Sequence, residues 1–296
     1  MTRLSPRTGQ VLLGKYHIEG IIGRGQQSVV LRVRHIELDE LCAVKLLGDE
    51  AAGSPEITKR FHREAMVAVK LRSEHAVKVT DVGALPDGMP YMVMELLDGQ
   101  DLRAVLAEAG PLGVPMASGL IVHACQALSE LHAMGMVHRD VKPAKLFLAC
   151  RDDGTPTLKI LDFGLVKITR ASDHEIMRAG AAAVGTPPYM APEQLRSARD
   201  LDQRADVWAL GVVLYELLSA RCPFPAETYA ELCMQIAVEQ PAPLVGVPPE
   251  IVAIVMRCLQ KDPAQRFQSV VELATALVPF CGERLFASRE LSRMRR

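Results

Sequence analysis

Met136-Val-His-Arg-Asp-Val-Lys-Pro-Ala-Lys-Leu-Phe-Leu148 is the stretch on which the interpretation of the whole chain rests. Within five positions it carries four ionisable side chains, His138, Arg139, Asp140 and Lys142, and apolar residues flank them on both sides. Charged side chains are seldom buried without a partner. The pattern therefore predicts a charged loop that is held between two buried segments.

A second polar position follows in Lys159-Ile-Leu-Asp-Phe-Gly164, where an apolar run ends in the carboxylate of Asp162. The run begins fourteen residues after Lys145. Carboxylate oxygens are preferred ligands of hard cations such as Mg²⁺. A single carboxylate at the end of a buried strand, close to a glycine, therefore predicts a metal ligand.

Three motifs resemble those of protein kinases in residue type, order and spacing. They are the catalytic loop (His138-Arg-Asp140 with Lys142 and Pro143), the metal motif (Asp162-Phe-Gly164) and the end of the activation segment (Ala191-Pro-Glu193). The chain thus resembles a eukaryotic-like, bacterial-type serine/threonine protein kinase domain. It departs from the family at Lys145, because the catalytic loop normally ends in Asn five residues after its Asp.

The resemblance implies an α+β, bilobal protein-kinase fold, with a five-stranded antiparallel sheet and one helix in the first lobe and a mostly helical second lobe. We expect a flexible lead-in over 1–13, the N-terminal lobe over 14–97, the C-terminal lobe over 98–283 and a basic tail over 284–296. Alternation of apolar and polar residues, or short apolar runs, predicts the strands, and a helical repeat predicts the helix. The predicted strands are 16–22, 29–35, 41–47, 77–82 and 91–95, and the predicted helix is 57–71.

Composition narrows the class of protein. Hydrophobic residues make up 49% of the 296, and the formal net charge is −1, which argues against a nucleic-acid binder that relies on a basic surface. The seven cysteines are scattered without a Cys-x-x-Cys pair, as is usual for reduced core cysteines in the cytosol. The chain also shows no apolar signal core and no membrane span. We therefore expect a soluble, cytoplasmic protein.

The glycine-rich stretch Gly23-Arg-Gly25-Gln-Gln-Ser28 lies between two predicted strands. A dinucleotide-binding fold would need a helix after the glycines, whereas the alternation over 29–35 predicts a strand. The glycines are therefore expected at the tip of a hairpin, which is either a plain turn or the kinase loop that covers the phosphates. Ser28 replaces the third glycine of the family, which predicts a stiffer tip and a modestly weaker grip on nucleotide.

Lys45 is a charge in the middle of an apolar strand, and such a lysine needs a partner. The resemblance implies that Lys45 contacts the phosphates and that Glu64, on the following helix, is its partner. The alternative for Glu64 is a solvated charge on that helix. Asp101 has two compatible interpretations, a ribose contact and the N-cap of the helix after it.

The resemblance further implies which residues carry the chemistry. Asp140 would orient the substrate hydroxyl or accept its proton, with Lys142 on the γ-phosphate, and Lys45 and Glu64 complete the catalytic set. Asp162 is expected to be the metal ligand. The residues expected to bind ATP are Ile22, Gly23, Gly25, Ser28, Val30, Ala43, Lys45, Met94, Glu95, Leu97, Asp101, Lys145, Phe147 and Asp162.

Lys145 changes the expected metal chemistry. A protonated lysine offers only donors and cannot ligate a cation. A single and a double positive charge about 4 Å apart repel by several kcal/mol even at an effective dielectric constant of about 20. We therefore expect one Mg²⁺ rather than two, and loss of one electrostatic contact of this kind costs about 10²–10³ in rate.

The activation segment, expected over 162–193, lacks hydroxyl residues between Met177 and Val184, where relatives usually carry Thr or Ser. Thr169, Ser172 and Thr186 remain. We therefore predict a weak or absent phosphorylation switch. Two scaffold roles also follow from the resemblance: Asp206 braces the backbone of the catalytic loop, and Arg266 pairs with Glu193.

Two functions from different classes remain open at this point. The first is a serine/threonine protein kinase that uses ATP and Mg²⁺ on protein substrates and is slowed by Lys145. The second is a pseudokinase, a module that binds nucleotide or a signalling partner and acts allosterically. A kinase of small metabolites fits less well, because Thr186 and Ala191-Pro-Glu193 resemble a platform for protein substrates.

Overall fold

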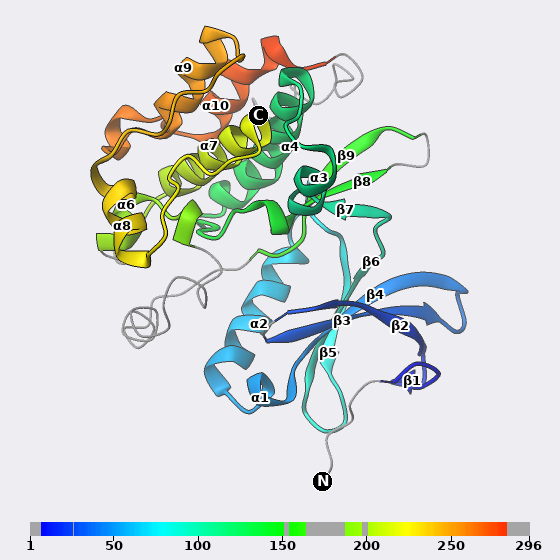
Figure 1. The fold of residues 1–296 in the computed structure, drawn as a ribbon. Coiled ribbons are helices and arrows are strands. Elements are labelled where there is room, and N and C mark those ends of the chain that lie inside the picture. Colours follow the sequence, from blue (N-terminus) through cyan, green and yellow to red (C-terminus); the bar gives the residue numbers. More distant parts are fainter. Residues whose placement is uncertain (1–6, 26, 151–153, 164–186, 197–200, 283–296) are drawn as a thin grey trace. The chain divides into compact units, whose positions relative to one another are not determined.

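The computed structural model describes residues 7–25, 27–150, 154–163, 187–196 and 201–282. The chain divides into two compact units, Met1–Asp98 and Gly99–Arg296 (Figure 1). The first unit holds one large sheet and two helices, and the second is mostly helical with a small sheet. This is the bilobal kinase fold that the sequence predicts.

The sheet of the first unit is antiparallel and has six strands in the order β1-β2-β3-β4-β6-β5, rather than the predicted five. The additional strand is β1, which lies within the predicted lead-in and pairs with β2. A strand of two residues is too short to show alternation, so its sequence carries no periodic signal. The strands are β1 Val11–Leu12, β2 Tyr16–Arg24, β3 Ser28–His35, β4 Glu40–Leu47, β5 Val79–Ala84 and β6 Pro90–Glu95.

The side chains on one face of this sheet form a hydrophobic core. Successive side chains of a strand point to opposite faces, and directly opposed residues share a face. The buried residues therefore recur at every second position and align across β2, β3, β4 and β6 (Tyr16, Ile18, Leu31, Val33, Val44, Leu46, Tyr91 and Val93). The side chains at the positions between them point to the other face of the sheet.

Helix α2, Pro55–Ala68, packs against β5 and β6 and follows the short helix α1, Asp49–Ala52. Ser54 caps its first turn, since the Ser54 hydroxyl accepts a hydrogen bond of 3.4 Å from the Ile57 amide. Pro55 takes the first helical position, where a missing N–H costs no hydrogen bond. Phe61 and Ala65 anchor the buried side of the helix, four residues apart.

The second unit is built around two long helices, α4 and α7, which are apolar on nearly all sides and buried along most of their length. Gly211 lets α7 approach α9 closely, because a Cβ at this position would lie 2.3 Å from the Cβ of Cys258. The helices are α3 Leu102–Ala109, α4 Val114–Ala133, α6 Pro192–Arg196, α7 Arg204–Ser219, α8 Tyr229–Val238, α9 Pro249–Cys258 and α10 Val270–Leu277.

A small sheet in the order β7-β8-β9 completes the second unit, with β7 Gly99–Asp101, β8 Leu146–Cys150 and β9 Pro156–Ile160. Between α4 and this sheet the chain turns at Gly135, whose φ of 70° is the left-handed conformation expected of a helix-ending glycine. Short 3₁₀ turns lie at η1 Pro143–Lys145, η3 Pro187–Tyr189, η4 Pro263–Gln265 and η5 Val278–Phe280. The catalytic-loop motif therefore follows α4 directly and leads through η1 into β8.

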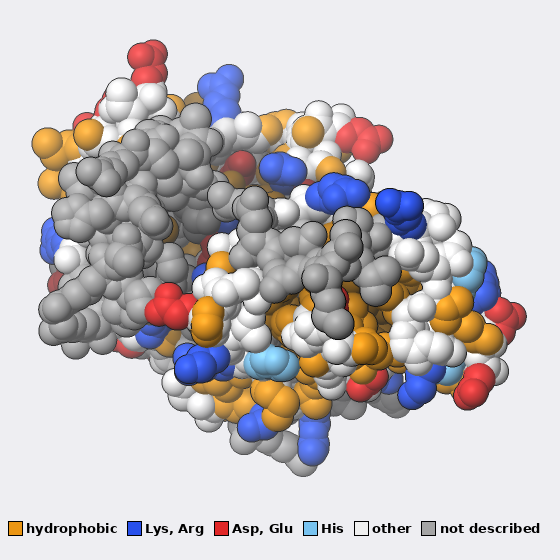
Figure 2. All heavy atoms as spheres, turned by 90° about the horizontal axis from the view of Figure 1, so that it is seen from below, with side chains coloured by type: hydrophobic (Ala, Val, Ile, Leu, Met, Phe, Trp, Pro, Cys, Tyr) orange, Lys and Arg blue, Asp and Glu red, His pale blue; other side chains and the backbone are white. Residues whose placement is uncertain are grey.

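Figure 2 shows one face of the surface, on which basic, acidic and hydrophobic side chains of the described residues are interspersed. Basic side chains lie there singly or in small groups. Among the described residues, no helix combines the length and the apolar character that crossing a membrane requires.

Candidate active site

The register of the N-terminal sheet brings several predicted nucleotide-binding residues onto one face. Val30 on β3 is directly opposite Lys45 on β4, and Ala43 is directly opposite Met94 on β6. Ala43 and Lys45 are two residues apart on the same strand and so share a face. These four side chains therefore lie on the face opposite the hydrophobic core.

The other predicted residues of this unit lie around that face. Gly23 on β2 is opposite Val30, and the irregular pairing just before it includes Ile22, which is 52% exposed. The hairpin tip closes through a hydrogen bond of 2.8 Å from the Gly25 amide to the Ser28 carbonyl. On β6, Glu95 ends the strand and accepts a hydrogen bond from the Lys78 amide, and Leu97 follows the strand.

Lys45 and Glu64 form the ion pair that the resemblance implies. The Nζ of Lys45 lies 2.9 Å from Oε1 of Glu64, and the two side chains are only 10% and 13% exposed. The solvated alternative for Glu64 does not describe this geometry. Glu64 therefore orients a nearly buried ammonium group.

Sequence reasoning missed a contact that ties the hairpin tip to α2. Arg60 donates a hydrogen bond to the side-chain carbonyl of Gln27, and the backbone carbonyl of Gln27 accepts from the Gly48 amide at 2.9 Å. Gln27 and Arg60 line a cavity of about 70 Å³ together with Lys45 and Glu64. The helical repeat of α2 predicts that Arg60 lies near Glu64, but nothing in the sequence predicts its contact with Gln27.

In the second unit, Asp206 near the start of α7 holds the backbone of the catalytic loop. Its two carboxylate oxygens accept hydrogen bonds from the amides of His138 and Arg139 at 2.9 and 2.8 Å. His132 at the end of α4 lies 2.7 Å from the same carboxylate. Burial alone raises the pKa of Asp206, but these donors outweigh it and the pKa is lowered. The predicted bracing role of Asp206 therefore corresponds to observed contacts.

His138 is fully buried and connects the two sequence motifs of the site. Its Nε2 lies 2.6 Å from the backbone carbonyl of Asp162, and its Nδ1 accepts a hydrogen bond of 3.2 Å from the Asp140 amide. Burial, followed by the charge of Lys145, lowers the pKa of His138, so the neutral ring suits this pattern of one donor and one acceptor. The ring also packs edge-on against Phe163, which points inward and is 1% exposed.

Asp140 lies between two ammonium groups. Nζ of Lys142 is 3.0 Å from one carboxylate oxygen, and Nζ of Lys145 forms an ion pair with the other. All three side chains are at most 18% exposed. Burial raises the pKa of the Asp140 carboxyl, but the charges of Lys145 and Lys142 together outweigh burial and the pKa lies below its usual range. The sequence drew attention to Lys145 as a metal-site change and did not predict its contact with Asp140.

Backbone contacts bring Lys145 next to the metal motif, because its carbonyl accepts a hydrogen bond of 3.0 Å from the Leu161 amide. Asp101 caps α3, accepting from the Ala104 amide at 2.9 Å, and lies directly opposite Phe147 in the small sheet. The N-cap interpretation of Asp101 is therefore confirmed. Asp140, Lys142, Lys145, Asp162, Asp101 and Phe147 all belong to one unit.

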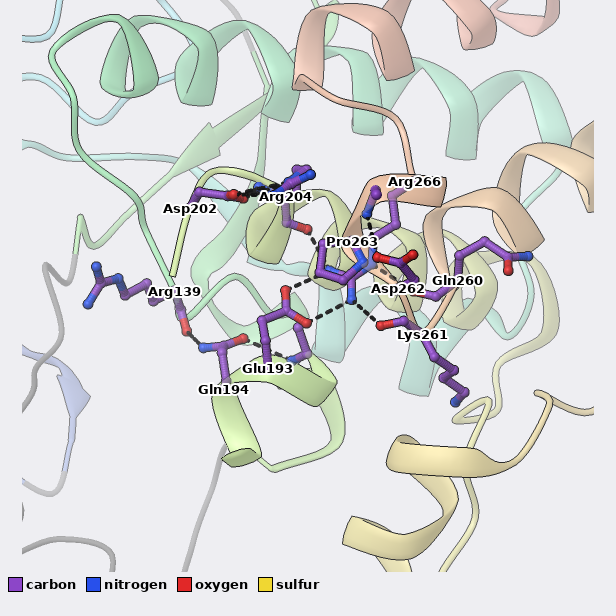
Figure 3. A network of polar contacts seen from close by, with 12 residues as sticks. Arg139, Glu193, Gln194, Asp202, Arg204, Gln260, Lys261, Asp262, Pro263 and Arg266 are labelled. Carbon is purple, nitrogen blue, oxygen red and sulfur yellow. Dashed lines mark hydrogen bonds and ion pairs between the residues drawn. The ribbon is translucent and has the colours of Figure 1, made fainter. Parts of the chain in front are cut away.

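Arg266 and Glu193 form the predicted scaffold pair, with two parallel hydrogen bonds of 2.7 Å (Figure 3). Arg266 also donates to the backbone carbonyls of Arg204, Gln260 and Lys261. The predictions for Gly164, Thr169, Ser172, Met177–Val184 and Thr186 lie outside the described residues.

Comparison with known families agrees with this geometry. A model of the protein kinase domain matches residues 16–277. The chain therefore belongs to the protein kinase family.

The chain is also similar to several bacterial proteins named as serine/threonine-protein kinases. It is 34% identical over 266 residues to the serine/threonine-protein kinase pkn3 of Myxococcus xanthus. This match covers 87% of this chain and 48% of that protein. It is 36% identical to the kinase Pkn1 of the same organism, covering 96% and 40% respectively. With the kinase PknB of Mycobacterium tuberculosis the identity is 36%, covering 90% and 43%. The chain thus spans less than half the length of these relatives.

Among solved structures, the chain is similar to the crystal structure of the Mycobacterium tuberculosis PknI kinase domain. The TM-score is 0.70 at 26% sequence identity, and the match covers 94% of this chain and all of that chain. The similarity therefore extends over the whole kinase fold.

Proposed function

We propose that this chain is a serine/threonine protein kinase that transfers the γ-phosphate of ATP to protein hydroxyls, at a rate lowered by Lys145. The observation that carries the proposal is the setting of Asp140: a nearly buried carboxylate, kept ionised by two ammonium groups, in a loop whose backbone is fixed by Asp206. The ion pair of Lys45 and Glu64 supports it.

We propose that the chain binds ATP together with one Mg²⁺. Lys45 offers an oriented, nearly buried ammonium group, as phosphate oxygens require. Asp162 is the proposed metal ligand, and Mg²⁺ would supply charge neutralisation on the phosphates. We assign the adenosine and phosphate contacts to the ATP-binding residues that the sequence indicates in each unit (Ile22, Gly23, Gly25, Ser28, Val30, Ala43, Met94, Glu95, Leu97, Asp101 and Phe147).

Asp140 has the proposed role of accepting a hydrogen bond from the substrate hydroxyl and then its proton as the phosphoryl group is transferred. Lys142, 3.0 Å from the Asp140 carboxylate, would balance charge that develops on the γ-phosphate. Because its pKa is lowered, Asp140 is a weak base and orients the hydroxyl more than it activates it.

Lys145 acts against this chemistry in two ways. Its ammonium group cannot ligate a cation, so we propose one Mg²⁺ in place of two. It also occupies one of the two carboxylate oxygens of Asp140 and competes with the substrate hydroxyl for that acceptor. The same contact favours the second candidate function, a pseudokinase in which Asp140 stays paired and the chain signals by binding nucleotide or a partner.

Transfer of labelled phosphate from ATP to a generic protein substrate separates the two functions. We expect the native chain to be about 10²-fold slower than Lys145→Asn, the change typical of one preorganised electrostatic contact, and clearly faster than Asp140→Asn. If the native chain equals Asp140→Asn while Lys145→Asn is active, the pseudokinase interpretation holds. Binding is tested separately, because Mg²⁺ and ATP should raise the melting temperature of the native chain and not of Lys45→Met.

A further inference from the structure

The residue before Asp140 has an unusual backbone. Arg139 has a φ of 63°, in the left-handed region that a side chain disfavours. Such a conformation persists only where the surroundings fix it, and it is found mostly at functional sites. The peptide bond between Arg139 and Asp140 sets the direction in which the Asp140 side chain leaves the loop. The groups that hold this peptide therefore decide where the carboxylate points.

Three of the contacts around this peptide come from residues already assigned to the loop or its brace. Asp206 accepts from the amides of His138 and Arg139, and the Nδ1 of His138 accepts from the Asp140 amide. These contacts hold N–H groups. They leave open what holds the carbonyl of Arg139, which is the other end of the same peptide.

Gln194 supplies that contact. Its Nε2 donates a hydrogen bond of 3.1 Å to the Arg139 carbonyl, and its Oε1 accepts one of 2.9 Å from the Ala191 amide (Figure 3). Because the side-chain oxygen of Gln194 accepts from the Ala191 N–H, its NH₂ group must be the one that faces the Arg139 carbonyl. The adjacent residue, Glu193, is fixed by its paired hydrogen bonds to Arg266. Helix α6 therefore presents Gln194 from an anchored position.

We infer that Gln194 is a positioning residue for phosphotransfer, which fixes the carbonyl of the peptide before Asp140 and so aims the carboxylate. It joins the end of the activation segment, at α6, to the catalytic loop through one hydrogen bond. The inference rests on the proposed kinase activity for its kinetic consequences. Its structural part, control of the loop backbone by Gln194, can be measured without activity.

Two substitutions separate the hydrogen bonds of Gln194. Gln194→Glu keeps nearly the same shape and keeps an acceptor for the Ala191 amide, but an ionised carboxylate cannot donate to Arg139. Gln194→Met fills similar space and loses both bonds. Gln260→Glu is the matched control, because Gln260 also donates from its side-chain amide to a backbone carbonyl, that of Met256 at 3.2 Å.

Kinetics are measured in the native chain and in the Lys145→Asn background. We expect both Gln194 variants to have about tenfold lower kcat, the change expected on loss of one hydrogen bond, with little change in the KM for ATP. Gln260→Glu should stay within about twofold of its parent, since Gln260 is partly buried and its side-chain hydrogen bond is a local one, to Met256 four residues earlier. As pH falls from about 6 to about 4, through the ordinary glutamate pKa of about 4.3, Gln194→Glu should recover relative to its parent, because a protonated carboxyl can donate again. Gln194→Met should not recover.

A kcat for Gln194→Glu and Gln194→Met within about twofold of the parent would overturn the inference, as would equal recovery of both at low pH. If neither parent transfers phosphate, the proposed activity fails and hydrogen exchange decides the inference on its own. The amides of residues 138–141 should then exchange faster in both Gln194 variants than in Gln260→Glu. Equal exchange in all three would show that Gln194 does not hold the loop.

Discussion

The ammonium group of Lys145 is paired with the carboxylate of Asp140, on the oxygen that Lys142 does not occupy. The two residues are five positions apart, and the 3₁₀ turn η1 folds the chain back so that their side chains meet. Under the proposed function, Lys145 would therefore affect the reaction through the group that orients the hydroxyl as well as through the metal. These two effects can be separated, because one depends on charge and the other on ligand chemistry.

The dependence of rate on Mg²⁺ separates them. Lys145→Asn removes the charge and offers an amide oxygen, so its rate should rise and should show a second phase as free Mg²⁺ increases at constant ATP. Lys145→Met removes the charge without offering a ligand, so it should gain rate with a single Mg²⁺ phase. Steady-state rates across a Mg²⁺ titration measure both. A second phase in Lys145→Met would contradict the assignment of Lys145 to the metal site.

The pH dependence of kcat/KM should report the pair directly. Lys145 lowers the pKa of Asp140 once the opposing effect of burial is overcome, so Asp140 stays ionised to lower pH in the native chain than it would alone. Lys145→Met should therefore raise this pKa and move the acid limb of the profile to higher pH. Lys70→Met, which removes a positive charge from an exposed position, is the control. An acid limb that moves equally in both variants would show that overall charge, and not this pair, is responsible.

Much of the fold could be predicted from the sequence because its signals are local. Alternation and short apolar runs predicted the five longer strands, and the helical repeat over 57–71 predicted α2. The two-residue strand β1 was missed because pairing with β2, and no pattern of its own, makes it a strand. The local sequence pattern therefore predicts where the longer elements lie. A strand too short to have a pattern is defined only by its pairing in the folded chain.

The site was predictable to the extent that motifs name residue types. Asp206 and the pair of Arg266 with Glu193 came from such motifs, and the structure has the corresponding contacts. The contact of Lys145 with Asp140 and that of Gln194 with Arg139 depend on the turn at η1 and on where α6 lies in space. No spacing in the sequence encodes these distances, so only coordinates could supply them.

Removal of the buried guanidinium of Arg266 should be strongly destabilising. Its side chain is fully buried, pairs with Glu193 and donates to three backbone carbonyls. Arg266→Met leaves a carboxylate and these carbonyls without their partner, which should cost about 3–5 kcal/mol in the free energy of unfolding. Denaturant unfolding measures this cost. Arg32→Met, which breaks an exposed pair with Glu19, should cost far less than Arg266→Met, and similar costs for the two variants would contradict the argument.

Lys261 is partly buried, and its amino group makes hydrogen bonds that a neutral amine can also make. Its Nζ donates to the carbonyls of Gln235 and Ile236 at 3.2 and 2.8 Å. It also lies 4.4 Å from the centre of the Phe224 ring, which stacks on Trp208. Burial, and then the nearby charge of Arg266, lowers the pKa of Lys261 to about 8.

This lowered pKa predicts how stability changes with pH. Between about pH 8 and the ordinary lysine pKa of 10.5, the unfolded chain binds a proton at Lys261 that the folded chain has lost. Stability therefore rises with pH across this window through Lys261, since it rises wherever the unfolded state binds more protons.

The variant Lys261→Met has no amino group at this position and so lacks this titration. We expect the free energy of unfolding of the native chain, minus that of Lys261→Met, to increase as pH is raised from about 8 to about 10. Subtracting the variant removes the titration of other lysines, tyrosines and cysteines common to both proteins. A difference that stays constant or falls over this window would show that Lys261 remains charged in the folded state.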